Sequence, residues 1–164
     1  MSEMMLRPTW RFVVAHPAHF IAFAGGIGLV PRAPGTFGTV LALPLYWLIA
    51  PRLSAAEFLL LWLALFVLGV WACETTGHAL GRPDHGGMVW DEMVAFLLVL
   101  FFVPHGPIWH GIAFLLFRLF DILKPQPIRY FDRTLKGGFG VMFDDIAAAI
   151  CVLFLLAAWK ALAG

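Results

Sequence analysis

The feature that most constrains this chain is a series of five apolar segments. They cover residues 37–50, 58–80, 91–103, 108–123 and 143–163. The second and fifth are long enough to cross a bilayer alone, because a helix rises about 1.5 Å per residue and a hydrocarbon core is about 30 Å thick. The other three reach only about 20 to 24 Å. If they cross the membrane, their helices must include flanking residues or the bilayer must be thinner around them. Otherwise they lie only partly embedded.

The composition supports a membrane setting. The chain is 62% hydrophobic and 13% charged, whereas ordinary soluble domains are about 25% charged. We therefore predict an all-α, multi-span helical membrane protein with about five apolar helices, some of them short or partly embedded. We expect residues 1–164 to form a single membrane-embedded domain. Within it, residues 1–24 form an N-terminal cytoplasmic or interfacial segment without the pattern of a secretory signal.

The charged residues predict which side of the membrane each loop occupies. If all five segments cross, nine of the eleven Lys and Arg residues lie on one side or at its edge, against Arg52 and Lys160 on the other. The positive-inside rule makes the first side cytoplasmic. Most of the acidic residues lie near the same face. The nine basic residues are Arg7, Arg11, Arg32, Arg82, Arg118, Lys124, Arg129, Arg133 and Lys136.

Net charge and cysteines give little sign of other functions. The formal charge is only +1 and the basic residues are scattered, so we expect no nucleic-acid partner. Cys73 and Cys151 lie far apart in apolar runs. Their positions indicate neither a disulfide framework nor a zinc site, and we interpret both as packing residues.

A glycine-rich stretch, GIGLVPRAPGTFGT, precedes the first apolar segment, whose helix we expect to begin near Phe37. Glycines permit close backbone approach, and free N–H groups at a helix start favour an anion such as phosphate. An ordinary tight turn capped by Thr36 explains the same residues about equally well.

Two pairs of adjacent acids open apolar helices. Asp91 and Glu92 follow RPDHGGMVW, and Asp144 and Asp145 follow the glycine-rich KGGFGVMF. Each pair alone could simply complement a helix dipole. Two such pairs on the same predicted interface, together with Asp121, are harder to explain in that way.

A third charged element lies in FRLFDILKPQP. Arg118, Asp121 and Lys124 follow one another at three-residue intervals, which places them along one face of a helix. They form either a self-neutralising structural ladder or the wall of a site. The two prolines that follow end the helix and turn Arg129 back along the interface.

The carboxylates gathered at this interface predict a metal site. Uncompensated charge is costly at membrane depth, and hard oxygen ligands of this density suit Mg²⁺, which also binds water and substrate phosphate. The basic residues nearby are types that bind phosphate. Acids for a metal and bases for phosphate indicate phosphoryl chemistry. The five carboxylates are those of Asp91, Glu92, Asp121, Asp144 and Asp145.

Four motifs, in this order and spacing, resemble the bacterial phosphatidylglycerophosphatase A family. They are PRAPGTFGT, DHGGMVWDEM, FRLFDILKPQPIRYFDR and GGFGVMFDDIAA, and the resemblance covers about residues 25–149. It implies an all-helical, Mg²⁺-dependent phosphoric monoester hydrolase of the bacterial inner membrane. Such an enzyme converts phosphatidylglycerophosphate to phosphatidylglycerol and phosphate, with its active site facing the cytoplasm.

The resemblance also implies roles for individual residues. One or two Mg²⁺ ions would be held by Asp91, Glu92, Asp121, Asp144 and Asp145, and all of these except Glu92 are also expected to be catalytic. The expected substrate-binding residues are Gly35, Thr36, Arg118, Lys124 and Arg129. Direct attack by water and an aspartyl-phosphate intermediate both remain open.

Two other classes of protein are alternatives. A small ion or proton transporter would carry its carboxylates near mid-span, with paths open to both sides. A non-catalytic scaffold would leave the acid cluster without a purpose. Metal-dependent release of phosphate separates both from a phosphatase.

Overall fold

The computed structural model describes residues 8–163, so Arg7 and the other residues of the expected N-terminal segment before Pro8 lie outside the described part. Within residues 8–163 every regular element is a helix and no strand occurs. The predicted all-α class is therefore confirmed. In chain order the elements are α1 (Trp10–Ala15), α2 (Pro17–Ala22), the 3₁₀ helix η1 (Ala24–Leu29), α3 (Pro34–Ile49), the 3₁₀ helix η2 (Ala50–Arg52), α4 (Ala55–Leu80), α5 (Trp90–Phe102), α6 (Pro107–Leu123), α7 (Ile128–Thr134) and α8 (Gly137–Ala163).

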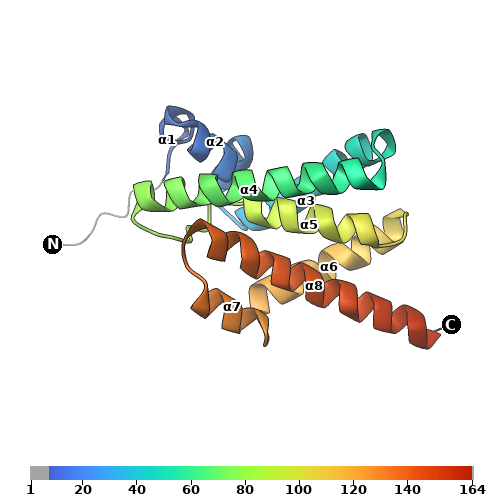
Figure 1. Ribbon diagram of the computed structural model, residues 1–164. Helices are drawn as coiled ribbons and strands as arrows, with labels where there is room; N and C mark the ends of the chain where they lie inside the picture. Colours follow the sequence, from blue (N-terminus) through green and yellow to red (C-terminus); the bar gives the residue numbers. More distant parts are fainter. Residues whose placement is uncertain (1–7, 164) are drawn as a thin grey trace.

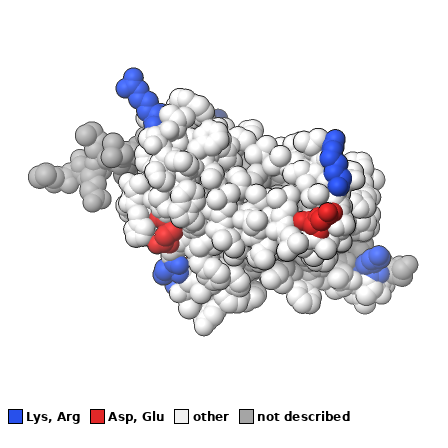
Figure 2. Space-filling model, turned by 45° about the horizontal axis from the view of Figure 1, so that its top comes forward, with Lys and Arg blue, Asp and Glu red and all other residues white. Residues whose placement is uncertain are grey.

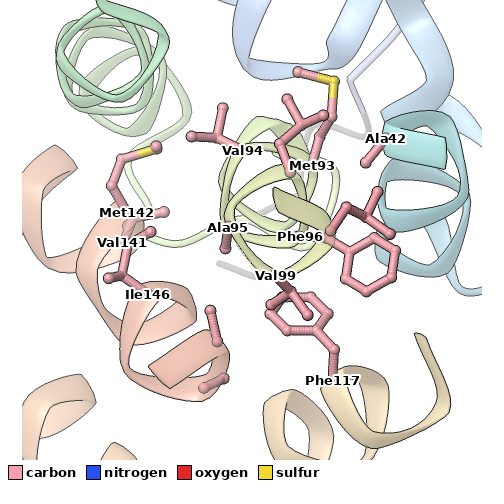
Figure 3. Close-up of a cluster of buried hydrophobic side chains, with 14 of the residues drawn as sticks. Ala42, Met93, Val94, Ala95, Phe96, Val99, Phe117, Val141, Met142 and Ile146 are labelled. Carbon is pink, nitrogen blue, oxygen red and sulfur yellow. The ribbon is translucent and has the colours of Figure 1, made fainter. Parts of the chain in front are cut away.

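Helix α5 is the centre of the bundle. It contacts α3, α4, α6 and α8, and its apolar residues are buried almost all the way round, as expected of a helix that is hydrophobic on every side. Figure 3 shows Phe96 beside Ala42 of α3, and Ala95 toward Met142 of α8. Phe117 of α6 covers the remaining side at Val99.

The two ends of the bundle of long helices differ in chemistry. The starts of α3, α5 and α8 lie at the end of the molecule where α4 and α6 finish (Figure 1). We call this the polar end. At the opposite end a cavity of about 460 Å³ is lined mainly by apolar and aromatic side chains, among them Tyr46, Trp47, Phe58, Phe101 and His105.

Among the described residues, two helices are long and apolar enough to cross a membrane. They are α4 and α8, whose most apolar stretches have mean hydropathies of 2.2 and 2.3. Large apolar side chains on both are exposed, including Leu60 at 67% and Phe154 at 74%. Figure 2 shows a face on which charged side chains are few and leave a broad uncharged area between them. The crossing of all five segments stays a prediction.

Two helix starts differ from the sequence expectation. Helix α3 begins at Pro34, and the preceding Ala33 has left-handed backbone angles, so Thr36 lies inside the first turn and does not cap the helix. Proline is well suited to a first helical position because its φ angle is already helical. Helix α8 begins at Gly137, so Asp144 and Asp145 lie about two turns inside it and not at its start.

The glycines before these aspartates have different roles: Gly137 has a left-handed φ of 70° at the turn into α8, whereas Gly138 serves helix packing. A Cβ atom on Gly138 would overlap the carbonyl oxygen of Val70, and it would also crowd the backbone of Glu74. The absence of that atom lets α8 lie directly against α4, with which it has extensive contact. Small residues commonly allow such close approach between helices in membranes.

Candidate active site

Three carboxylates converge at the polar end. Asp91 and Glu92 lie in the first turn of α5 and Asp145 lies in α8. One carboxylate oxygen from each is within 4.8 Å of the others. Asp91 is only 6% exposed and Asp145 only 3%. Like charges at this spacing, largely removed from water, repel one another unless a cation lies among them.

The donor set of this cluster fits a divalent metal ion. Asp91 Oδ1 and Glu92 Oε2 are buried and have no hydrogen-bond partner among the described residues. Buried polar atoms are nearly always paired, so these two oxygens have spare capacity to bind a ligand. Carboxylate oxygens are the ligands that Mg²⁺ prefers in proteins. The described residues therefore satisfy the chemical requirement for the predicted metal site.

Arg118 connects α6 to this cluster. Its Nη1 atom lies 2.6 Å from Asp121 Oδ2 and 3.6 Å from Glu92 Oε1. The side chains of all three residues are at most 14% exposed, so water screens these charges only weakly. The Nε atom of Arg118 is buried without a partner among the described residues. The guanidinium thus neutralises two carboxylates and still has a donor to spare.

Lys124 forms a second ion-pair group. Its Nζ atom lies 2.5 Å from Asp144 Oδ2 and 2.8 Å from Asp132 Oδ1. Lys124 is the C-cap of α6 and has left-handed backbone angles, φ 44° and ψ 60°, so it leaves the helical face on which Asp121 lies. The predicted three-residue ladder is therefore divided. Arg118 pairs with Asp121, whereas Lys124 pairs with carboxylates from α7 and α8.

These pairs fix the charges of Lys124 and Asp132. Burial acts to lower the pKa of Lys124, but the charge of Asp144 and the hydrogen bonds to both carboxylates raise it above its ordinary value. Burial acts to raise the pKa of Asp132, but the hydrogen bond from Lys124, the charge of Lys124 and smaller contributions from Asp144 and Lys136 together lower that pKa. Both groups are therefore ionised at neutral pH.

The glycine-rich start of α3 touches the acid cluster. A Cβ atom on Gly35 would overlap the carboxylate of Glu92 and lie 3.3 Å from Arg118 Nη2. Only glycine allows this turn to approach so closely. The N–H of Thr36 donates to the carbonyl oxygen of Ala33, so it is already used within the turn.

Arg129 lies apart from these groups. It is exposed on α7 and takes part in neither ion-pair group. Of the expected substrate-binding residues, the structure therefore brings together Gly35, Arg118 and Lys124 around the carboxylates.

Two polar residues of the site were not singled out from the sequence. Thr39 Oγ1 accepts a hydrogen bond from Arg118 Nη1 at 3.3 Å, and Asp132 binds Lys124. The spacing of four residues from Gly35 could have indicated that Thr39 shares its helix face. Asp132 follows Lys124 across a proline-containing turn, and no local periodicity predicts that contact.

A cavity of about 420 Å³ adjoins the second ion-pair group. The α4–α5 loop, α7 and the start of α8 form its walls. Asp144 and Asp132 line it, so both partners of Lys124 border this space. Its charged lining consists of Arg82, Asp84, Asp132, Lys136 and Asp144. A polar molecule could thus reach the ion pair from this side.

Comparison with known proteins gives a consistent result. The family model described as phosphatidylglycerophosphatase A matches residues 20–160. The Haemophilus influenzae phosphatidylglycerophosphatase A is 41% identical over 157 residues, covering 93% of this chain and 96% of the relative. The Escherichia coli K12 phosphatidylglycerophosphatase A is 37% identical over 142 residues, covering 85% and 81%.

A third relative has a different name. A Bacteroides thetaiotaomicron protein, provisionally named a phosphatidylinositol-3-phosphatase, is 40% identical over 141 residues, covering 80% of this chain and 86% of the relative. No solved structure gives a significant match to the chain.

Proposed function

The chain belongs to the phosphatidylglycerophosphatase A family, and from this premise we propose that it hydrolyses the terminal phosphomonoester of phosphatidylglycerophosphate. The products are phosphatidylglycerol and inorganic phosphate. The observation that best supports this proposal is the convergence of three carboxylates beside a buried arginine. Phosphomonoester hydrolysis needs these two kinds of group together. Two of the three carboxylates have a buried oxygen without a hydrogen-bond partner in the described part of the chain.

Asp91, Glu92 and Asp145 would hold Mg²⁺, with Asp121 and Asp144 completing the acidic surroundings. When bound, the ion would stabilise charge on the phosphoryl oxygens and lower the pKa of an attacking water. Asp121 and Asp144 act mainly through their basic partners, because each lies within 2.6 Å of one. They hold the side chains of Arg118 and Lys124 in place and limit the repulsion among the carboxylates.

Arg118 and Lys124 bind the substrate phosphate. A guanidinium and an ammonium both match phosphate oxygens, and the guanidinium can donate two parallel hydrogen bonds. Gly35 keeps the first turn of α3 close to Glu92 without filling the space beside it. We assign Thr36 and Arg129 to the outer part of the same substrate site, where they contact the headgroup beyond the scissile phosphate.

Hydrolysis then requires one water molecule. The water oxygen forms a bond to phosphorus as the bond from phosphorus to the glycerol oxygen breaks, and the glycerol oxygen takes up a proton. A carboxylate of the cluster can accept the proton that the water loses. The configuration at phosphorus distinguishes this route from an aspartyl-phosphate, because one in-line displacement inverts it and two displacements restore it. Retention of configuration in a chirally labelled phosphate product would contradict direct attack by water.

We further propose that residues 1–164 form one domain of the bacterial inner membrane, with all five long helices embedded and the polar end facing the cytoplasm. Residues 1–24 lie at the cytoplasmic interface. The clustering of basic residues at the polar end supports this orientation. The lipid tails of the substrate stay in the bilayer, while its headgroup reaches the carboxylates from the interface.

The decisive experiment measures phosphate release from phosphatidylglycerophosphate in mixed micelles by the purified protein. We expect release with Mg²⁺, none with a chelator, and a loss of at least about a hundredfold in Asp145→Asn. Glu57→Gln is the matched control, because Glu57 is an exposed carboxylate in the first turn of α4, at the opposite end of the molecule. No metal-dependent release by the parent protein would refute the proposal.

Phosphatidylinositol 3-phosphate should be assayed in parallel. The name of the Bacteroides relative makes this lipid the most informative competitor. Release from that lipid alone would overturn the proposed substrate while leaving the phosphomonoesterase class intact.

A further inference from the structure

Thr39 has a hydroxyl group whose two hydrogen bonds join α3 to the arginine of the site. The residue is fully buried, at 0% exposure. Its Oγ1 donates to the Gly35 carbonyl oxygen at 2.9 Å and accepts from Arg118 Nη1 at 3.3 Å. The directions are unambiguous, because a carbonyl cannot donate and a guanidinium cannot accept.

The other partners of Arg118 are charged. Asp121 lies on the same helix as Arg118, whereas Glu92 lies on α5. A guanidinium between two carboxylates can turn to form a two-point pair with either one. The neutral hydroxyl of Thr39 holds Nη1 from a third direction without adding negative charge. It therefore fixes the orientation of the guanidinium and leaves its positive charge available to an anion.

We propose that Thr39 is a positioning residue, which holds Arg118 in the orientation that receives the substrate phosphate. This inference rests on the proposed phosphatase function. Without the hydroxyl, the guanidinium is expected to turn toward Asp121 and Glu92, and these carboxylates then compete with the phosphate for its donors. The loss should therefore appear in phosphate affinity more than in the rate of the chemical step.

A purely structural role for Thr39 makes a different prediction. Threonine hydroxyls in helices often bond to the carbonyl four residues earlier without any function. Thr76 provides a matched control, because it is also 0% exposed and its hydroxyl lies 3.0 Å from His19 Nδ1. If burial of a bonded hydroxyl were the whole effect, Thr39→Val and Thr76→Val would behave alike.

The test compares Thr39→Val, Thr39→Ser and Thr76→Val for KM, kcat, inhibition by inorganic phosphate and thermal unfolding. We expect Thr39→Val to raise both KM and the inhibition constant of phosphate roughly tenfold, with a much smaller change in kcat. Thr39→Ser restores the hydroxyl and should restore both constants. Thr76→Val should leave both constants unchanged, although its unfolding temperature can fall.

A second comparison asks whether Thr39 acts through Arg118. In an Arg118→Lys background, Thr39→Val should raise KM and the inhibition constant of phosphate little further. The guanidinium geometry that Thr39 supports is already lost in that background. Equal effects in both backgrounds, or a Thr39→Val protein whose constants match those of Thr76→Val, would overturn the inference. If the parent protein releases no phosphate, the proposed function fails instead. Calorimetric binding of inorganic phosphate then still decides whether Thr39 positions Arg118.

Discussion

At the level of single residues, the two cations of the site neutralise different carboxylates. Arg118 serves Glu92 and Asp121 at the acid cluster, whereas Lys124 joins Asp144 to Asp132 on the short helix α7. Replacing a charged residue of the Arg118 group should therefore change activity and stability differently from replacing one of the Lys124 group.

Asp121→Asn should mainly reduce turnover. With Asp121 neutral, Arg118 is expected to pair fully with Glu92 and to weaken that carboxylate as a metal ligand. We expect kcat to fall by about a hundredfold or more, as for loss of a group that orients a metal site. Steady-state kinetics over a range of Mg²⁺ concentrations measures this. A normal kcat at saturating Mg²⁺ would contradict the role given to Asp121.

Lys124→Gln should mainly weaken substrate binding and stability. Asp144, whose side chain is 7% exposed, would lose its closest cation, and an uncompensated buried charge is expected to cost about 3 kcal/mol of unfolding free energy. KM should rise more than kcat falls. Denaturant unfolding in detergent measures the stability change.

A double variant provides the control for this prediction. Adding Asp144→Asn to Lys124→Gln removes the stranded charge, so stability should recover in part although activity does not. A double variant less stable than Lys124→Gln alone would show that charge burial is not the cause.

The residues of the site were only partly predictable. The sequence placed Asp91, Glu92 and Asp145 at one interface, and the structure brings one carboxylate oxygen of each within 4.8 Å of the others. The expected reason differs for Asp145, which lies inside α8 and not at its start. A role for Thr39 was not predicted, since a threonine hydroxyl inside an apolar helix commonly bonds to the backbone of its own helix without any function. Its function depends on a contact with Arg118, which is remote in the sequence.

At the level of helices, the five apolar segments correspond to α3, α4, α5, α6 and α8. Hydrophobic runs of this length identify helices well. The helices α1, α2 and α7, which have only six or seven residues, were not predicted, because so short a segment shows little periodicity. The start of α8 was placed too late because its glycines favour a turn locally. Gly137 does have a turn-like positive φ, but the helix already continues through Gly138, which packs against α4.

Gly138→Ala tests that account of α8. The added methyl group would overlap the backbone of α4 at Val70, so the two helices must separate. We expect a loss of about 1 to 3 kcal/mol of stability, typical of overpacking, measured as a lower unfolding temperature in detergent.

Gly111→Ala is the matched control. A Cβ atom at Gly111 would meet nothing within 4 Å, and the position is exposed on α6. Replacement should be neutral or stabilising by up to about 1 kcal/mol. If both variants destabilised equally, helix propensity and not close packing would explain Gly138.

At the level of the whole molecule, the two ends of the bundle have different chemistry. The ion pairs and the acid cluster lie at the polar end, and the opposite end has an aromatic cavity. This asymmetry suits an enzyme at one interface better than a transporter, which needs a polar path open to both sides. The sequence predicted that most charged residues gather at one end of the molecule. In a chain that crosses a membrane repeatedly, every second loop lies on the same side, and these loops carry most of the charges.

Cysteine labelling tests the orientation in the membrane. In a background with Cys73 and Cys151 replaced by alanine, we expect Arg52→Cys to react with a membrane-impermeant maleimide in intact spheroplasts. Lys136→Cys should react only after the membrane is opened. Both native side chains are exposed, so access to each depends on the side of the membrane. The reverse pattern would place the polar end outside the cytoplasm.

The distribution of the three carboxylates over α5 and α8 has a consequence for biosynthesis. A ribosome completes Asp91 and Glu92 well before it reaches Asp145, which lies on the helix translated after all the others described. A nascent chain halted before α8 therefore carries two acids with no third to meet them. If these three carboxylates hold the metal as proposed, we expect chains that stop before α8 to be inert toward lipid.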